Sequence, residues 1–339
     1  MSARMKDIAR DLGVSIVTVS KVLRNHADIS AETRERVLKR MKELNYKPNL
    51  AARALVTGKS YIMGLIVPDL VHPFFAQVAK KMSYVLRDHG YNLVISSSNE
   101  DPELEQQEIE QLLARRVDAL VIASAQWTVE SMRLIEQHRT PYILIDRKFV
   151  GLAANFVGVD DEAVGNLATE HLIDIGCQTI AHIGGPEVST AIGRREGYRR
   201  ALLRRGRELR PEYMVVREHG DDASDITGCQ AMRDLLRLDP RPDGVFCYND
   251  PTAMGAMQAV LQSGLQVPQD VAIVGCGNVL YAGLLRVPLS SVDQDSEGIG
   301  ENAAKLSLTL VDAKSPVRPR SVMLEPKLVI RESTRRDVA

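Results

Sequence analysis

The sequence predicts a small helical head followed by two doubly wound α/β lobes, an α + α/β architecture. In the first 48 residues, apolar side chains recur at helical spacing in three short segments. From Tyr61 onward, continuous apolar runs alternate with amphipathic helical segments, which is typical of parallel sheets covered by helices on both faces. The apolar runs are too many for one small sheet, so we expect two lobes with a cleft between them.

The first two helices are expected within the segment Met5–Leu23. Gly13 has no Cβ and permits a sharp turn between them. Ser15 is suited to cap the second helix, whose Val19 and Val22 would face the first helix. Two short helices joined in this way form a helix-turn-helix, whose second helix fits the major groove of DNA. An ordinary helical hairpin in a small core is the alternative.

A third helix and a short linker complete the head. Ser30 is suited to cap the third helix, with Thr33 rather than glutamate at the capping-box position. Its apolar stripe comprises Val37, Leu38, Met41 and Leu44. The next segment, Asn49–Leu55, is alanine-rich and helix-prone, but a helix this short is marginal in water. We therefore expect a linker unless a DNA groove or a symmetry mate stabilises the helix.

The body is expected to alternate strands and helices throughout. The expected strands are Ile62–Pro68, Asn92–Ser96, Ala119–Ile122, Tyr142–Ile145, Phe156–Val159, Thr179–Ile183, Tyr213–Val216, Gly244–Cys247, Val271–Val274, Ser290–Val292 and Ser321–Arg331. The expected helices are Phe74–His89, Pro102–Arg115, Thr128–His138, Asp161–Ile175, Arg194–Arg205, Ile226–Arg237, Pro251–Ser263 and Ser296–Val311. The expected boundaries are 1–48 for the head, 49–60 for the hinge helix and linker, 61–161 with 293–321 for the first lobe, 162–292 with 322–332 for the second lobe, and 333–339 for a tail.

Polar residues follow many of these strands, at the edge where ligands bind in open α/β sheets. They are Asp69, Ser96 to Ser98, Ser124, Asp146, Asp160, Asn249, Asp250 and Asn278. One lobe is therefore expected to close on the other around a small hydrogen-bonding molecule.

Charge is distributed unevenly along the chain. The first 60 residues hold 13 Lys/Arg against 6 Asp/Glu, a balance of +7, whereas the remaining 279 residues hold 30 against 38, a balance of −8. A basic head on an acidic body is expected when only the head meets a polyanion. A solvated face on a small helical domain is the alternative.

Composition narrows the class of protein. The 45% hydrophobic and 26% charged residues are typical of a globular protein, and no apolar run reaches the roughly 18 residues of a membrane span. The N-terminal segment is charged and amphipathic, unlike a secretory signal. Four scattered cysteines fit a reducing compartment. We expect a cytoplasmic protein that does not associate with membranes.

Two other functions are less consistent with the residues. A periplasmic sugar-binding protein shares the two-lobed body but needs a signal peptide and no basic head. An enzyme on a Rossmann-like scaffold needs a motif that is missing, since the glycine clusters at Gly184 and Gly275 do not match G-x-G-x-x-G. Walker A and G-x-S-x-G motifs are also missing, and the seven histidines show no ligand spacing. We expect no catalytic activity, no cofactor and no metal.

In combination, these segments resemble the LacI/GalR family of transcription regulators from Met5 to about Ser333. The matching segments are KDIARDLGVSIVTVSKVL, ISAETRERVLKRMKELNYKPNLAARAL, GLIVPDLVHPFFAQV, RRVDALVIAS, PYILIDR, VGVDDEAVGNLATEHLIDIG, IAHIGGP, REGYRRAL, DGVFCYNDPTAMGAMQAV, GLQVPQDVAIVG and PKLVIRES. The resemblance implies a periplasmic-binding-protein-like body and a homodimer with each head on one half-site of an operator in double-stranded DNA.

For the head, the resemblance implies that Ile16, Val17 and Lys21 read bases. Lys21 can donate to guanine, and the two apolar side chains can contact a thymine methyl group, although core packing is their alternative role. The residues implied as phosphate contacts are Ser15, Thr18, Ser20, Asn25 and Thr33. Solvation or capping is an equally simple role for each of these five.

The resemblance also identifies the segment NLAARAL as a hinge helix. It implies that Leu55 inserts between central base pairs and bends the DNA, with Asn49 and Arg53 in or beside the minor groove. A contact with the body is the alternative role for Leu55.

For the cleft, the resemblance implies an effector site for a sugar or sugar derivative. Asp146, Arg194, Asn249 and Gln294 match pocket residues, and such carboxylate, guanidinium and amide groups can each hold two hydroxyl groups. The remaining implied contacts are Phe74, Phe75, Trp127 and Asn278. First-turn core packing is the alternative for the phenylalanines, and an interface role is the alternative for Trp127.

Two positions depart from the family pattern. Gly277 stands where most members have aspartate, and an aromatic lid residue is missing near Asp222. Arg147, Arg194 and Arg195 leave room for an anionic ligand, although each arginine can instead be ion-paired with a neighbour.

The family resemblance implies allosteric control, most simply repression. Ligand in the cleft would change the angle between the lobes and so pair or separate the two hinge segments of the dimer. A coupling of about 1–3 kcal/mol would switch hinges that are marginal alone. The segment after Arg331 shows no heptads, so we expect a dimer rather than a tetramer.

Overall fold

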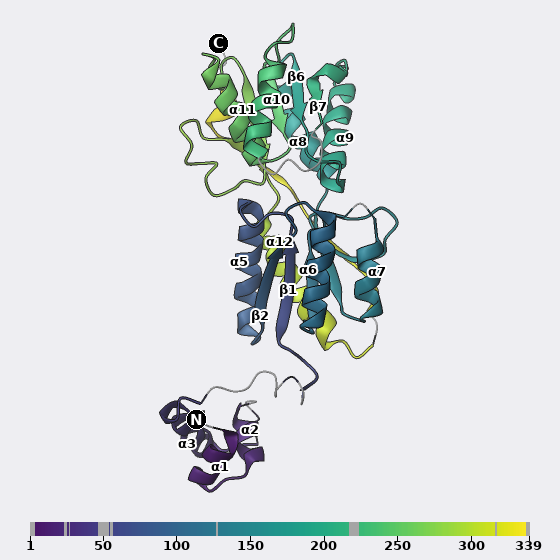
Figure 1. The fold of residues 1–339 in the computed structure, drawn as a ribbon. Coiled ribbons are helices and arrows are strands. Elements are labelled where there is room, and N and C mark those ends of the chain that lie inside the picture. Colours follow the sequence, from purple (N-terminus) through teal and green to yellow (C-terminus); the bar gives the residue numbers. More distant parts are fainter. Residues whose placement is uncertain are drawn as a thin grey trace. The chain divides into compact units, whose positions relative to one another are not determined.

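The computed structural model describes residues 4–23, 26, 28–46, 54, 57–126, 128–216, 224–315 and 317–336. The chain divides into two compact units, Met1–Ser60 and Tyr61–Ala339. We call the first unit the head and the second the body (Figure 1).

The head contains three helices, α1 (Met5–Leu12), α2 (Ile16–Leu23) and α3 (Ala31–Glu43). Gly13 ends α1 with a left-handed φ of 64°, and the Ser15 hydroxyl accepts a hydrogen bond from the Thr18 amide at 2.9 Å at the start of α2. Val19, Val22 and Val37 are buried in one cluster with Ile8 and Ala9 of α1. The predicted helix-turn-helix and both of its packing valines are confirmed.

One residue of the predicted α3 stripe is wrong. The side chain of Leu38 is 49% exposed, whereas its neighbour Val37 is fully buried. In a three-helix core of this size, α1 and α2 together cover only one narrow face of α3, and Leu38 lies outside that face. Ser30 caps α3 as predicted, since its hydroxyl accepts from the Thr33 amide at 3.2 Å.

The first lobe has a six-stranded sheet in the order β11-β5-β4-β3-β1-β2, in which all the strand pairs are parallel. Its strands are β1 (Ile62–Val67), β2 (Asn92–Ser97), β3 (Ala119–Ile122), β4 (Tyr142–Ile145), β5 (Asn155–Val159) and β11 (Ser321–Leu324). Its helices are α5 (Pro73–Asp88), α6 (Pro102–Ala114), α7 (Glu130–Gln137) and α12 (Ser296–Asp312). Helices α5 and α12 cover one face of the sheet, and α6 and α7 cover the other.

The second lobe repeats this plan with a sheet in the order β12-β10-β9-β8-β6-β7. Its strands are β6 (Ile180–Ile183), β7 (Met214–Val215), β8 (Gly244–Cys247), β9 (Ala272–Cys276), β10 (Ser290–Asp293) and β12 (Lys327–Val329), of which β12 is antiparallel to β10. Its helices are α8 (Asp161–Asp174), α9 (Ser189–Arg204), α10 (Ser224–Leu235) and α11 (Asp250–Gln262), with short 3-10 turns at Pro211–Tyr213 and Glu332–Thr334. Helices α8 and α9 cover one face, and α10 and α11 cover the other.

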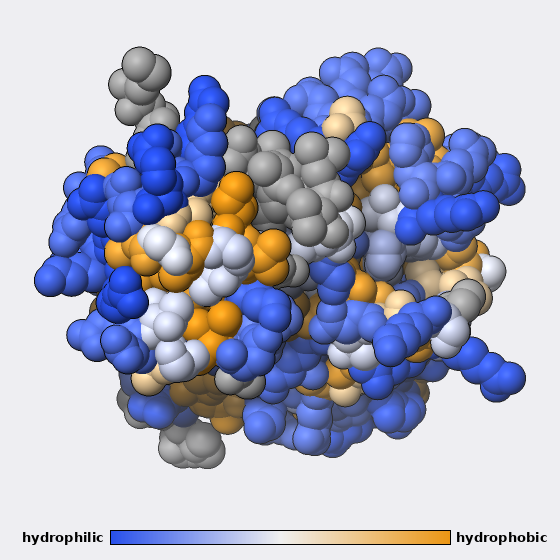
Figure 2. All heavy atoms as spheres, turned by 90° about the horizontal axis from the view of Figure 1, so that it is seen from below, coloured by the Kyte–Doolittle hydropathy of each residue, from blue (hydrophilic) through white to orange (hydrophobic). Residues whose placement is uncertain are grey.

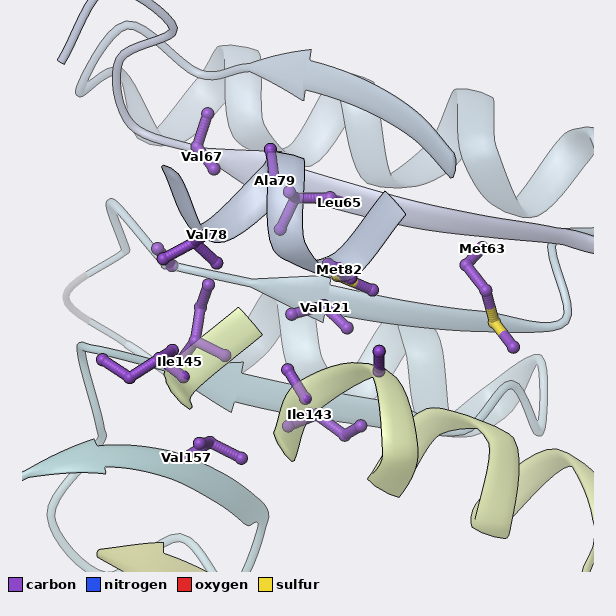
Figure 3. Packing of buried hydrophobic residues seen from close by; sticks show 14 of the residues in the cluster. Met63, Leu65, Val67, Val78, Ala79, Met82, Val121, Ile143, Ile145 and Val157 are labelled. Atoms are coloured by element: carbon purple, nitrogen blue, oxygen red, sulfur yellow. The ribbon is translucent and has the colours of Figure 1, made fainter. Parts of the chain in front are cut away.

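The core of the first lobe follows from strand periodicity. Alternate residues of β1, namely Met63, Leu65 and Val67, point to the side of α5 and α12. Figure 3 shows these side chains with Val78 and Met82 of α5 in one layer. This packing fixes the carboxyl ends of the parallel strands, from which the site residues project.

The last predicted strand is wrong as a single element. Ser321–Arg331 forms two strands, β11 in the first sheet and β12 in the second. Glu325 and Pro326 lie between them, and proline has no backbone N–H for a sheet hydrogen bond. Residues 322–324, which the sequence placed in the second lobe, therefore belong to the sheet of the first.

Helix α9 also begins earlier than predicted, at Ser189 rather than Arg194. It packs closely on α8 because glycines line the crossing. A Cβ added to Gly165 of α8 would lie 2.0 Å from the backbone oxygen of Arg194, and one added to Gly197 would lie 2.1 Å from that of Glu162. The two helix backbones are therefore in direct contact.

Within the described residues, no helix is long and apolar enough to cross a membrane. Figure 2 shows hydrophilic residues over most of the face seen from below, with hydrophobic residues between them in smaller patches.

Candidate functional site

The exposed face of α2 carries two of the three predicted base-reading residues. Ile16 is 51% exposed and Val17 is 60% exposed, while Val19 and Val22 fill the core. This exposure removes core packing as the alternative role of Ile16 and Val17. Two apolar side chains on an otherwise polar helix surface suit contact with thymine methyl groups, and that contact remains a prediction.

Lys21, the third predicted reader, forms an ion pair with Asp28 in the loop after α2. The hydrogen bond from Lys21 lowers the pKa of the Asp28 carboxyl group, which stays ionised. A base or phosphate must therefore compete with this carboxylate for the ammonium group. The pair holds the Lys21 ammonium group near the end of α2, and base reading by Lys21 remains a prediction.

The predicted phosphate contacts have local partners in the described head. Ser15 caps α2, and its hydroxyl lies 2.9 Å from that of Thr18. The Ser30 hydroxyl donates to that of Thr33 at 2.9 Å, and Ser20 is half-buried on α2. These contacts are consistent with the capping alternative and leave phosphate binding untested. Asn25, Asn49, Arg53 and Leu55 lie outside the described residues.

Replacing Lys21 with alanine is expected to weaken specific operator binding by roughly 10- to 100-fold, the range for one direct base contact. Fluorescence anisotropy on a duplex selected from random DNA by the wild-type protein measures the change. Lys42→Ala on the exposed surface of α3 is the matched control, with the same loss of charge. Equal losses for the two variants, or an equal loss on unselected DNA, would remove Lys21 from base reading.

Between the lobes, the structure brings four predicted effector residues together at strand and helix ends. Asp146 follows β4, Arg194 lies on α9, Asn249 precedes α11, and Gln294 follows β10. All four side chains are buried. The Gln294 amide nitrogen donates to the Asp146 carboxylate at 3.4 Å, which joins β4 of the first lobe to the segment leaving β10 of the second. This convergence fits the expected cleft site.

Arg194 is held in place by two groups of its own lobe. Its Nε donates to Asp161 at 3.0 Å, and its Nη1 donates to the backbone oxygen of Tyr248 at 2.8 Å, with the guanidinium 4.8 Å from the centre of the Tyr248 ring. Burial raises the pKa of Asp161, although Arg194 acts in the opposite direction. The second terminal nitrogen, Nη2, makes no hydrogen bond with the described residues and is the group best suited to a ligand.

The three arginines considered for an anionic ligand all have carboxylate partners. Arg147 forms a bidentate pair with Glu100 at 2.6 and 2.7 Å, Arg194 pairs with Asp161, and Arg195 pairs with Glu187. Each of these three guanidinium charges is thus balanced by a carboxylate. This arrangement matches the ion-paired alternative and favours a neutral ligand.

The phenylalanines are part of the first-lobe core. Phe74 and Phe75 are buried at the start of α5, with ring centres 5.1 Å apart, and both rings contact His72. They belong to the same hydrophobic cluster as β1. Phe74 and Phe75 therefore pack in the core at the first turn of α5, as the alternative proposed, and a contact of either ring with the ligand remains a prediction.

The geometry does not favour Asn278 as an effector contact. Its amide nitrogen donates to Asp293 at 2.9 Å, and its amide oxygen accepts from Arg331 at 2.6 Å. The neighbouring Gly277 has a φ of 120°, which residues with a Cβ rarely adopt, so aspartate would be strained at this position. Trp127 and Asp222 lie outside the described residues.

Sequence reasoning missed two residues of the cleft. The Asp161 carboxylate accepts a hydrogen bond from Arg194. The two consecutive aspartates after a strand, Asp160 and Asp161, could have indicated this role, although Asp160 itself caps α8. His72 caps α5 and reaches Asn249 of the other lobe at 3.3 Å. A histidine before proline at a helix start gives little indication of such a contact.

Buried polar atoms without a hydrogen-bond partner among the described residues also mark this region. They include Ser98 Oγ after β2, Arg147 Nε after β4 and Thr252 Oγ1 in the first turn of α11. Native structures seldom leave buried polar groups unpaired, and ligands or ordered water usually pair the exceptions. These atoms are consistent with a site that takes a hydrogen-bonding molecule.

Comparison with known families gives two matches that together span most of the chain. Residues 4–49 match the family described as bacterial regulatory proteins, lacI family. Residues 60–324 match the family described as periplasmic binding proteins and sugar binding domain of LacI family.

Individual proteins are similar along their whole lengths. The ribose operon repressor of Haemophilus influenzae is 35% identical over 335 residues, covering 98% of each chain. A crystal structure of the lac repressor dimer bound to operator and the anti-inducer ONPF is 27% identical, with a TM-score of 0.84 over 98% of this chain and 99% of that chain. A complex of the transcriptional regulator CelR with cellobiose is also 27% identical, with a TM-score of 0.74 over the same shares.

Proposed function

Because the chain belongs to the LacI family of bacterial regulatory proteins, we propose that it is an operator-binding transcriptional repressor controlled by a small polyhydroxylated ligand. The observation that carries this proposal is the combination of two surfaces in one chain. Helix α2 of the head exposes Ile16 and Val17, and a buried carboxylate, a guanidinium and two amides converge between the lobes of the body. The family consists of regulators, so the body acts as a sensor and not as an enzyme.

The head supplies DNA recognition in this proposal. Ile16, Val17 and Lys21 contact base edges, and the polar residues at the helix ends contact phosphates. Two copies of the chain place two such heads on the half-sites of one operator. A regulator of chromosomal DNA works in the bacterial cytoplasm, which is the location that we propose.

The cleft supplies ligand control. Its arginines are already paired, so the ligand that fits it is neutral, with hydroxyl groups bonded by Asp146, Asn249, Gln294 and the remaining nitrogen of Arg194. The similar ribose operon repressor and the CelR–cellobiose complex make a sugar the first class to test. Ligand binding changes the angle between the lobes, and this change reaches the DNA through the hinge segments of the dimer.

The direct test measures DNA binding and ligand response together. DNA fragments are selected from a random pool by the full-length protein, and anisotropy then measures their affinity with and without D-ribose, D-galactose, cellobiose and gluconate. Tight, sequence-specific binding that a neutral sugar changes at least tenfold would support the proposal. Absence of sequence preference would overturn it, and a response to gluconate alone would overturn the neutral ligand.

Operator affinity should also fall steeply with salt, because each phosphate contact releases a condensed counterion. Between 50 and 200 mM KCl, we expect a loss of roughly 10³-fold for about six contacts. Titrations at four salt concentrations measure the slope. An affinity that stays within twofold across this range would contradict a phosphate-based interface.

A further inference from the structure

The contact between His72 and Asn249 is unusual among the bonds that cross the cleft. His72 precedes α5 in the first lobe, and Asn249 precedes α11 in the second. The His72 Nε2 and Asn249 Nδ2 atoms lie 3.3 Å apart. Which of these two nitrogens donates and which accepts is settled by the other bonds that each side chain makes.

The orientation of Asn249 is set by its own helix. Its Oδ1 accepts from the Thr252 amide at 2.9 Å and caps α11, so the NH₂ group is the one that faces His72. An amide NH₂ group has only hydrogens to offer. Asn249 is buried, so water does not readily replace the missing acceptor.

The tautomer of His72 is set in the same way. Its Nδ1 accepts from the Phe74 amide at 3.3 Å and caps α5, which puts the single proton of a neutral ring on Nε2. Burial lowers the pKa of His72, against the raising effect of Asp69 and Asp146, so the ring is neutral at pH 7. Two N–H donors therefore face each other. The other tautomer only moves the conflict to the Phe74 amide.

The backbone adds to this conflict. Both side chains stand at helix N-termini, α5 and α11, whose free N–H groups and dipoles carry partial positive charge. Nearby Thr252 has a buried hydroxyl without a partner among the described residues. Positive ends of two helices and two hydrogen donors thus meet at one point between the lobes, where an acceptor oxygen would satisfy both donors.

We propose that His72 and Asn249 form a closure gate, in which two facing donors oppose closing of the empty cleft and jointly bind one acceptor oxygen of the ligand when it closes. The hydroxyl or ring oxygen of a polyhydroxylated molecule is the chemical class that fits. This inference rests on the proposed function for its ligand, but the opposition to closure is a property of the empty protein. Binding and closing are coupled because only the ligand removes the donor conflict.

The test changes one donor into an acceptor. Asn249→Asp keeps an oxygen for the Thr252 amide and turns a second oxygen toward His72 Nε2–H, so the conflict becomes a hydrogen bond. His72→Gln makes the converse change, because its longer side chain carries an amide oxygen as far as Nε2, where this oxygen can accept from the Asn249 NH₂ group. Asn92→Asp is the control for added negative charge. Asn92 is exposed at the start of β2, away from the carboxyl ends of the strands where His72 and Asn249 meet.

Closure is read by single-molecule energy transfer in the full-length protein without ligand, with one labelled copy per dimer. Dyes are attached at Val150→Cys and Ile192→Cys, which are exposed and lie close to the Lys148–Ser189 contact between the lobes. The native cysteines (Cys177, Cys229, Cys247 and Cys276) are buried. Measurements at 0.1 and 0.5 M KCl separate the hydrogen bond from longer-range attraction, which salt screens.

We expect Asn249→Asp and His72→Gln each to raise the closed fraction of the empty protein roughly tenfold, as one hydrogen bond replaces a conflict. Asn92→Asp should match the wild type. An unchanged closed fraction in either acceptor variant, or an equal rise in Asn92→Asp, would overturn the gate. Operator binding and sugar response of the wild type test the proposed function separately, so either idea can fail alone.

Discussion

Replacing Arg194 with alanine should destabilise the protein by about 3–5 kcal/mol, because it leaves the buried Asp161 carboxylate without its partner. The loss should be larger at pH 8.5 than at pH 6. Burial holds the folded-state pKa of Asp161 above its unfolded value, so the carboxyl group costs stability as the pH rises through that folded pKa. At lower pH the unpaired group takes up a proton and the penalty shrinks.

Urea unfolding of the full-length protein at both pH values measures this effect. Arg195→Ala is the matched control, since its ion pair with Glu187 is partly exposed and contributes less than about 1 kcal/mol. Loss of the Arg194 side chain should also abolish sugar binding in calorimetry, even below the unfolding transition. An Arg194→Ala protein as stable as the Arg195→Ala protein at pH 8.5 would show that Asp161 does not depend on this pair.

Replacing Gly165 with alanine should have the second large effect, on both stability and the site. The new Cβ would lie 2.0 Å from the backbone oxygen of Arg194, so α9 must move away from α8. We expect a loss of about 1–3 kcal/mol from this overpacking, after the gain of about 1 kcal/mol in helix propensity. Since Arg194 lies on the displaced segment, sugar affinity should fall at least tenfold.

The control for this prediction is Gly283→Ala, where an added Cβ would meet nothing closer than 3.6 Å. Thermal unfolding and calorimetry of both variants provide the comparison. A Gly165→Ala protein with wild-type unfolding temperature and sugar affinity would mean that the α8–α9 crossing can relax without moving the guanidinium.

The order of elements was predictable because local patterns determine it. Val19, Val22 and the Ser15 cap locate the helix-turn-helix, and apolar runs such as Ala119–Ile122 and Gly244–Cys247 have the bounds expected from their residues. Asp146 and Asn249 were predicted both by the family resemblance and by their places after strands, whereas Arg194 and Gln294 came from the resemblance alone. A strand end is a local feature, so its polar residue can be identified without the fold.

What could not be predicted depends on contacts between distant segments. The run Ser321–Arg331 looks continuous, and only the two sheets show that it divides at Glu325 and Pro326. Asn278 looks available by its position, but Asp293 and Arg331 engage both ends of its amide. The donor conflict at His72 can be recognised only from the hydrogen bonds that the caps of α5 and α11, His72 and Asn249, already accept.

The late position of β11 and α12 in the chain has a consequence for synthesis on the ribosome. The first lobe needs α12 to complete its core and β11 to complete its sheet, and both follow all of the second lobe except β12 and the last 3-10 turn. A nascent chain that ends before Ser296 therefore exposes the face of β3, β4 and β5 that α12 covers in the finished protein. The head can fold as soon as it emerges, whereas the sensor must wait for almost the last residues. During synthesis, a folded head is therefore present before the sensor body can respond to a ligand. In that interval the first lobe exposes an apolar surface to which chaperones can bind.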